Sequence, residues 1–170
     1  MPPSTSNDGC GGSRLAADPV GEAFSEACLW ILERRGGDPR FASVNPAPPG
    51  RGTGISFEVS GNARIELSRA IGSQTLFLGY GTKDRELHDR LWKAWGGTEE
   101  ALSIHLSECF EQAGLRESFP VERVRNTEDW IAIRLRPTPD ELDSLEGRER
   151  ILRMIEGFHL AFPPGNAISH

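Results

Sequence analysis

The chain has 170 residues, with 19 Lys and Arg against 25 Asp and Glu, and its formal net charge is -6. Since a phosphate backbone is bound by clustered basic side chains, this balance disfavours nucleic acid as a partner. No apolar run is long enough to span a membrane, and residues 1–13 lack the basic start and apolar centre of a signal peptide. The three cysteines form no CxxC pair, so we expect a reducing, cytoplasmic location.

Composition changes along the chain and sets the expected domain boundaries. Residues 1–17 are rich in Ser, Gly, Pro and Asn, which predicts a disordered tail, and residues 165–170 are expected to form a flexible C-terminus. Residues 18–164 are expected to form a single domain. Within it, the segment Asp38–Gly54 is rich in Pro and Gly, which predicts neither a helix nor a regular strand ladder there.

Helix signals recur through the domain as capping residues followed by apolar positions at helical spacing. The last of them, Thr138-Pro139-Asp140-Glu141, has the pattern of a capping box with proline at the first helical position. A break in this final helix is expected near Gly147. The predicted helices begin at Asp18-Pro19, Thr82, Thr98 and Thr138, and they end at Gly36-Gly37, Gly96-Gly97, Gly114 and Pro163-Pro164.

Alternating apolar residues predict the strands. The runs Ile55–Val59 and Ala63–Leu67 flank Gly61-Asn62, which is a strong hairpin signal because both residues tolerate the positive φ of a tight turn. The segment Gln74–Tyr80 is more uniformly apolar, so we expect a central strand or one covered on both faces. Two further strands are predicted over Phe119–Arg125 and Trp130–Arg136.

This order predicts an α+β fold with an antiparallel sheet of about five strands. The elements run as a helix, a three-strand meander, two helices, a hairpin and a closing helix. Hairpins joined in sequence favour antiparallel pairing, because parallel pairing needs a crossover between strands. We therefore expect the helices to pack mainly on one face of the sheet.

Several patterns invite a catalytic or metal-binding interpretation, and each is incomplete. His105 and Cys109 stand four residues apart on one predicted helix, but two ligands do not make a zinc site. Cys28 lies in mid-helix among apolar residues, where a thiol reacts poorly. The glycines around Lys83 could hold an anion at a helix start, although an ordinary strand-to-helix turn explains them better.

Paired acids on the predicted sheet raise the question of metal-dependent nuclease chemistry. Glu58 and Glu66 lie on paired strands, but no lysine follows at the required offset. Alternation places both acids opposite the apolar face, where polar side chains are expected in any case. We therefore predict no catalytic residue, no bound metal and no cofactor.

Tryptophans are the residues that point most clearly to a binding surface. Trp92 and Trp95 lie on one predicted helix, and Trp130 begins a strand with its side chain opposite Ile131. Large amphipathic rings at the edge of a core are enriched at protein interfaces, although an ordinary core edge also accounts for each. We name Trp92, Trp95 and Trp130 as the candidate anchors for a partner protein.

The order of elements resembles that of type III secretion chaperone-like domains. It includes the meander GISFEVSGNARIELS, the hairpin FPVERVRNTEDWIAIRLR and the closing amphipathic helix. The resemblance implies a small, acidic, non-enzymatic and dimeric protein whose twisted sheet binds a partner polypeptide. The two middle helices and the long Pro- and Gly-rich segment depart from the family pattern. No binding residue is carried over from the family.

A second similarity, to accessory domains of restriction and other nucleic-acid-processing systems, is carried by RIELSRAIGSQTLFLGYG and VERVRNTEDWIAIRL. It would use Arg134 and Arg136, which share one strand face, as nucleic-acid contacts. The main expectation is a non-enzymatic protein-binding module, chaperone- or adaptor-like, that acts on a protein partner or as a homodimer and has no membrane contact. The alternative is a nucleic-acid-binding accessory domain of a processing or defence system.

Overall fold

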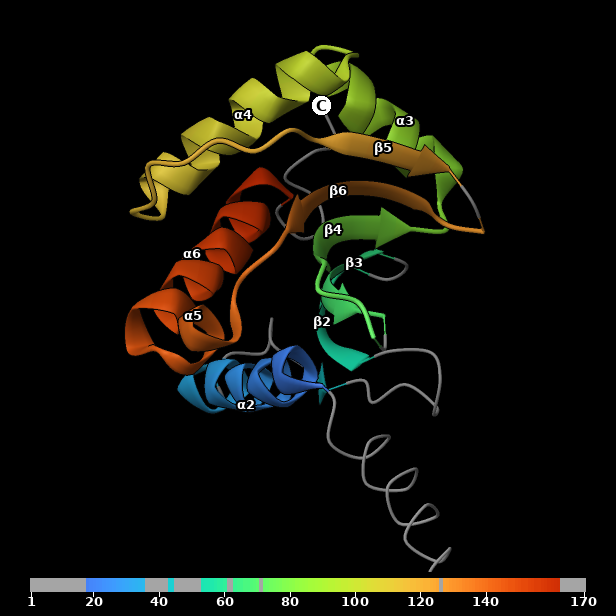
Figure 1. Cartoon of the computed structure of the whole chain (residues 1–170). Helices are drawn as coiled ribbons and strands as arrows, with labels where there is room; N and C mark the ends of the chain where they lie inside the picture. Colours follow the sequence, from blue (N-terminus) through green and yellow to red (C-terminus); the bar gives the residue numbers. More distant parts are fainter. Residues whose placement is uncertain are drawn as a thin grey trace, which may run out of the picture.

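The computed structural model describes residues 18–35, 43–44, 53–60, 63–70, 72–125 and 127–162, and only the backbone of residues 43, 44, 53 and 60. The predicted N-terminal tail, the predicted flexible C-terminus and the turn at Gly61-Asn62 lie outside these residues. Figure 1 shows the arrangement of the elements. The helices are α2 (Pro19–Arg34), α3 (Arg85–Ala94), α4 (Glu99–Gln112), α5 (Pro139–Asp143) and α6 (Leu145–Ala161). The strands are β1 (Ser43–Val44), β2 (Thr53–Ser60), β3 (Ala63–Arg69), β4 (Leu76–Thr82), β5 (Glu122–Arg125) and β6 (Asp129–Leu135).

The strands form one antiparallel sheet in the order β1-β2-β3-β4-β6-β5. The predicted α+β class and the predicted order of elements are therefore confirmed. The sheet has one strand more than expected, because β1 pairs with β2 inside the segment Asp38–Gly54, where no ladder was predicted. That expectation was wrong for four residues. Ser43 and Val44 form β1, which is short enough to fit between the prolines of the segment, and Thr53 and Gly54 begin β2 and pair with β3.

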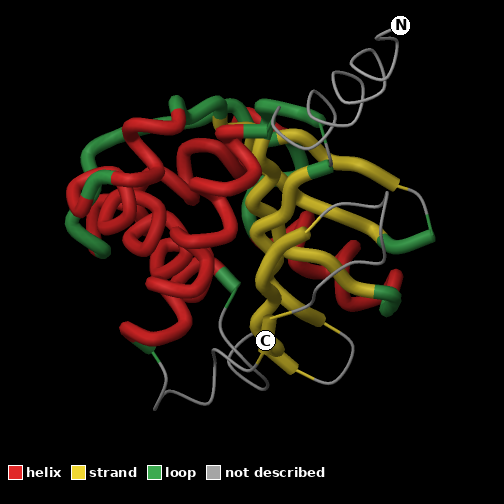
Figure 2. The backbone as a smooth tube through the Cα atoms, turned by 60° about the horizontal axis from the view of Figure 1, so that its bottom comes forward, coloured by secondary structure: helices red, strands yellow, loops and turns green. Residues whose placement is uncertain are grey.

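Helices cover one face of the sheet. Figure 2 shows most of them gathered on one side of the strands. There α4 packs against α6, and α2 packs against α5. A single core lies between this helical layer and the inward-facing strand residues, as predicted. The largest fully buried side chains are Tyr80, Phe24, Phe57, Phe110, Phe158, Phe162, Ile31, Ile55, Ile65, Leu67, Leu76 and Leu78.

Polar side chains fix the helix starts. The Asp18 carboxylate accepts from the Gly21 N–H at 3.1 Å, and the Thr98 hydroxyl accepts from the Ala101 N–H at 3.0 Å, both as expected of N-caps. The predicted capping box is confirmed, because Thr138 and Glu141 each accept a backbone hydrogen bond from the other.

Two helix boundaries differ from the sequence-based expectation. Thr82 is the last residue of β4, and Asp84 caps α3 by accepting from the Leu87 N–H at 3.0 Å. The Thr82 hydroxyl instead accepts from the Asp84 N–H at 3.0 Å, so it stabilises the turn before the helix. The break in the final helix lies at Ser144 rather than at Gly147, and Ser144 ends α5 while it caps α6.

Candidate functional site

The face of the sheet that points away from the helices is the candidate site. Strand register decides which side chains it carries, because successive residues point to opposite faces. Along β4, Leu76, Leu78 and Tyr80 point into the core. The outward positions are Phe77, Gly79 and Gly81, which pair on one side with Ser68, Glu66 and Arg64 of β3 and on the other with Arg134, Ala132 and Trp130 of β6.

A groove of about 410 Å³ lies on this face. Gly79 and Ala132 are paired and form its floor. A Cβ at position 79 would stand 3.0 Å from both the Ala132 Cβ and the Ile131 carbonyl oxygen, so a side chain there would fill the floor. The residues that line the groove are Glu66, Ser68, Phe77, Gly79, Glu122, Val124, Trp130, Ala132 and Arg134.

Aromatic rings close the groove at its two ends along the strands. The Trp130 ring covers Gly81, where its Cζ3 atom is 2.6 Å from the place a Cβ would take. The Arg64 guanidinium carbon lies 4.9 Å from the centre of that ring. At the other end, the guanidinium carbon of Arg134 lies 5.1 Å from the centre of the Phe77 ring. Both arginines are therefore within the range of cation–π attraction.

Ion pairs hold these arginines in place. Arg64 donates from Nε to Glu66 at 3.1 Å and from both terminal nitrogens to Glu128 at 2.7 and 3.1 Å. Burial disfavours the charged form of Arg64, but the hydrogen bonds to Glu128 and Glu66 outweigh it and raise the pKa of the guanidinium. Arg134 donates from Nε to Glu122 at 2.7 Å. The groove thus has an apolar floor, aromatic ends and charged sides.

Of the three predicted anchors, only Trp130 lines the groove. Trp95 stacks on His105 with ring centres 5.1 Å apart and meets the edge of Phe162 at 4.7 Å. Trp92 lies on α3, where the Arg123 guanidinium carbon is 4.4 Å from its ring centre. Arg123 pairs with Ile131, which points into the core. Trp92 and Trp95 therefore belong to the helical side, and the structure does not bring the three tryptophans together.

The two arginines named for nucleic-acid binding have different settings. Arg134 is on the groove wall and is occupied by Glu122 and Phe77. Arg136 is exposed just beyond the end of β6. The pair does not extend into a continuous basic surface here, since the neighbouring rim residues Glu66 and Glu122 are acidic.

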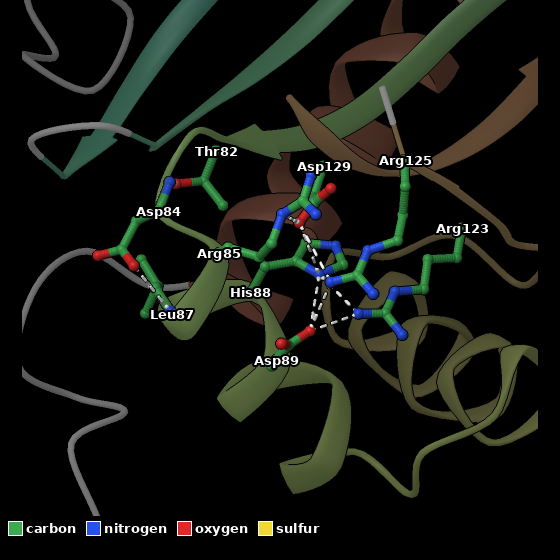
Figure 3. A network of polar contacts seen from close by, with 9 residues as sticks. All are labelled: Thr82, Asp84, Arg85, Leu87, His88, Asp89, Arg123, Arg125 and Asp129. Atoms are coloured by element: carbon green, nitrogen blue, oxygen red, sulfur yellow. Dashed lines mark hydrogen bonds and ion pairs between the residues drawn. The ribbon is translucent and has the colours of Figure 1, made fainter. Parts of the chain in front are cut away.

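A second polar network joins α3 to the β5–β6 hairpin on the helical side, and Figure 3 shows its side chains. His88 lies at the centre of this network and is fully buried. Its Nδ1 atom is 3.1 Å from Arg123 Nη2. A guanidinium only donates, so Nδ1 accepts and the neutral ring carries its proton on Nε2. Arg123 and Arg125 both donate to Asp89, at 2.7 and 2.8 Å.

Asp129 of β6 completes this network, and its Oδ2 atom lies 3.9 Å from His88 Nδ1. It is almost fully buried, and its Oδ2 lies 3.4 Å from Arg85 Nε and 3.4 Å from Arg125 Nη2. Within the described part of the chain, Asp129 Oδ1 and His88 Nε2 are buried without a hydrogen-bond partner. Burial, followed by the charge of Arg123, lowers the pKa of His88. The arrangement fastens a helix to a hairpin and keeps its histidine neutral.

Two further patterns named from the sequence are the His105–Cys109 pair and the Cys28 thiol. His105 Nε2 and Cys109 Sγ are 3.9 Å apart, and among the described residues no group of three or more His, Cys, Asp or Glu is placed to hold a metal ion. Burial raises the pKa of the Cys28 thiol to about 12, so it is a poor nucleophile as expected. None of the helices in the described ranges combines the length and apolar character needed to cross a bilayer.

Sequence reasoning missed Phe77, Gly79, Ala132, Glu122 and Val124 as parts of one site. The signal was present in LFLGYGT, where Phe77, Gly79 and Gly81 alternate with larger core residues. A strand face with one ring and two glycines forms a hollow rather than a packed surface. The strand was correctly expected to be central, but the helices cover only one of its faces.

The geometry is that of an open, amphipathic surface groove. Its polar groups are carboxylates and guanidinium groups already engaged with one another, and its floor is apolar. Such a lining is suited to contact with a side chain that has both apolar and polar parts. No protein family, no curated protein and no solved structure gives a significant match to this chain.

Proposed function

We propose that this chain is a non-enzymatic protein-binding module, chaperone- or adaptor-like, that holds a segment of a partner polypeptide on the open face of its sheet. The observation that carries the proposal is the groove over Gly79 and Ala132, which no helix of the described chain covers. A partner side chain that lies on the apolar floor between the two aromatic rings loses its contact with water. Such desolvated side chains contribute most of the binding free energy at protein interfaces.

The expected partner segment is a linear one with apolar side chains. The groove is bounded by an aromatic ring at each end along the strands, so it accommodates a short stretch of a partner chain. Val124 extends the apolar surface toward β5 and is 42% exposed. This function agrees with the resemblance of the element order to type III secretion chaperone-like domains. We expect the protein to bind its partner in the cytoplasm.

Panning a phage library of random dodecapeptides on the full chain tests this proposal. We expect the selected peptides to bind the wild-type chain in a calorimetric titration. Ala132→Leu, which extends a side chain into the groove, should weaken them roughly tenfold, the effect of losing one buried anchor. Val124→Ser at the rim gives a second disruption, because it removes apolar contact area without adding charge and leaves the floor unchanged.

The matched control is Ser25→Leu, which adds the same apolar bulk to an exposed position of α2. Thermal melting of each variant shows that it is folded. Equal affinity of the wild type, Ala132→Leu and Val124→Ser would refute the proposal, and so would failure to select any peptide. Salt-sensitive binding of DNA or RNA that Arg134→Ala with Arg136→Ala removes would instead favour the nucleic-acid alternative.

A further inference from the structure

Acidic side chains outnumber basic ones around the groove. Register places Glu66 beside Gly79 and Glu122 beside Ala132, so these two carboxylates flank the floor from opposite sides. Glu128 and Glu58 add two more acids to the same face, whereas its basic side chains among the described residues are Arg64, Arg134 and, just beyond β6, Arg136. A guest in the groove therefore meets more negative than positive charge.

The flanking carboxylates also keep hydrogen-bonding capacity. Glu66 accepts from Arg64 through Oε2, and Glu122 accepts from Arg134 through Oε2. In the described ranges, the Oε1 atom of neither residue receives a hydrogen bond from the protein. An ionised carboxylate accepts through both oxygens, so each has room for a second donor. Those free acceptors lie on the two sides of an apolar floor.

Building on the proposed function, we propose that the groove selects a basic side chain of the partner, Arg or Lys, with an apolar residue beside it. The aliphatic stem lies on Gly79 and Ala132, and the cationic head reaches Glu66 or Glu122. Long basic side chains cover apolar surface with their stems while the charge stays in a polar setting.

An acidic guest fits this site worse than a basic one. Its carboxylate would face Glu66 and Glu122 and would have to displace them from Arg64 and Arg134. A purely apolar guest would use the floor but leave the free Oε1 atoms without a donor. The site therefore favours a linear, basic and apolar segment, which also suits a chain of net charge -6.

The test uses the dodecapeptides selected on the full chain. We expect an Arg or Lys flanked by apolar residues to recur among them. Replacing that residue by citrulline or norleucine should weaken binding to the wild type roughly fivefold to tenfold, as for a lost charge-assisted hydrogen bond. Glu66→Gln with Glu122→Gln should remove most of this difference, because Gln keeps an acceptor for each arginine but not the charge.

The control is Glu100→Gln with Glu111→Gln, which makes the same change of net charge on exposed positions of α4. It should leave the preference for the basic peptide intact. Selected peptides without a basic residue, or equal binding of the arginine and citrulline peptides, would overturn this inference. If Ala132→Leu still abolishes binding in that case, the proposed function stands and only the basic preference fails. If Ala132→Leu has no effect, the proposed function itself fails.

Discussion

His88 shows how one buried residue makes the fold sensitive to pH. Its Nδ1 accepts from Arg123 at 3.1 Å, so a proton at Nδ1 would break that bond and set two cations against each other. Arg125 adds to this repulsion, and Asp129 and Asp89 oppose it. Desolvation acts in the same direction as the arginines, and the pKa of His88 is lowered from its ordinary value of 6.5.

We predict that stability falls as the solution is acidified and that His88 contributes to the fall. The unfolded chain takes up the proton more readily than the folded one, so the stabilisation is complete above pH 6.5 and is lost as the pH drops through the lowered folded pKa. In His88→Asn, the amide oxygen can still accept from Arg123 but does not titrate. Urea denaturation from about pH 8 to about pH 5 should show a smaller pH dependence in this variant.

His105 supplies the necessary comparison, because burial lowers its pKa as well. His105→Gln should remove a separate part of the pH dependence, and the two substitutions should be additive since they lie in different contacts. An unchanged pH dependence in His88→Asn would show that the buried ring is not a source of the effect.

At the scale of elements, α4 packs against α6, and Gly157 of α6 faces the Phe110 ring of α4. A Cβ at position 157 would stand 2.8 Å from Phe110 Cε1, and the ring is fully buried and cannot move aside. The glycine is therefore a requirement of the packing between the two helices rather than a weak point of α6.

We predict that Gly157→Ala destabilises the fold by roughly 1–3 kcal/mol, the usual range for overpacking. Without the contact to Phe110, Gly157→Ala would stabilise the fold, because the helix propensity of alanine is about 1 kcal/mol more favourable than that of glycine. Urea denaturation measures the difference. Leu160→Ala, at a position of the same helix that is 46% exposed, should change stability by much less, and stabilisation by Gly157→Ala would contradict the packing argument.

Elements were predictable from the sequence where the signal is local. The hairpin of β2 and β3, the caps at Asp18 and Thr98 and the capping box at Thr138 all depend on residues within one turn, and each was confirmed. At the start of α3, two capping residues lie two positions apart, and both Thr82 and Asp84 accept backbone hydrogen bonds. The sequence does not distinguish the turn from the cap in that case.

The groove depends on pairing between strands that are far apart in the chain. Trp130 was expected to point away from Ile131, and it does, but its position over Gly81 follows only from the register of β4 with β6. Trp92 and Trp95 satisfy the same compositional rule for interface residues, yet they pack with the helices. Composition identified the residue type, and only long-range pairing identified which tryptophan reaches the open face.

At the scale of the whole molecule, α4 protects the β5 edge of the sheet from pairing with a further strand. The backbone N–H of Val121, just before β5, donates to Ser103 Oγ at 3.0 Å. The backbone N–H of Arg123 in β5 donates to Glu99 Oε2 at 2.8 Å. Both acceptors belong to α4, so one helix occupies donors that would otherwise be open to a further strand. Partner binding by strand addition is thus disfavoured at this edge.

We predict that Glu99→Ala with Ser103→Ala makes the protein associate with itself at rising concentration, because an uncovered edge pairs with another edge. Sedimentation velocity over a concentration series measures the change. Glu100→Ala, at an exposed position beside Glu99, should sediment as the wild type does. If the double variant also sediments unchanged, the side chains of α4 are not what protects the edge.

The indole of Trp130 gives the molecule an internal optical reporter. Its ring is half-buried and lies at the end of the groove, whereas Trp30, Trp92 and Trp95 are also half-buried but pack against the core away from the groove. A guest that displaces water from the groove would shift the emission of Trp130 to shorter wavelength against a nearly constant background from the helical side. Occupation of the sheet could therefore be followed in dilute solution without attaching any dye.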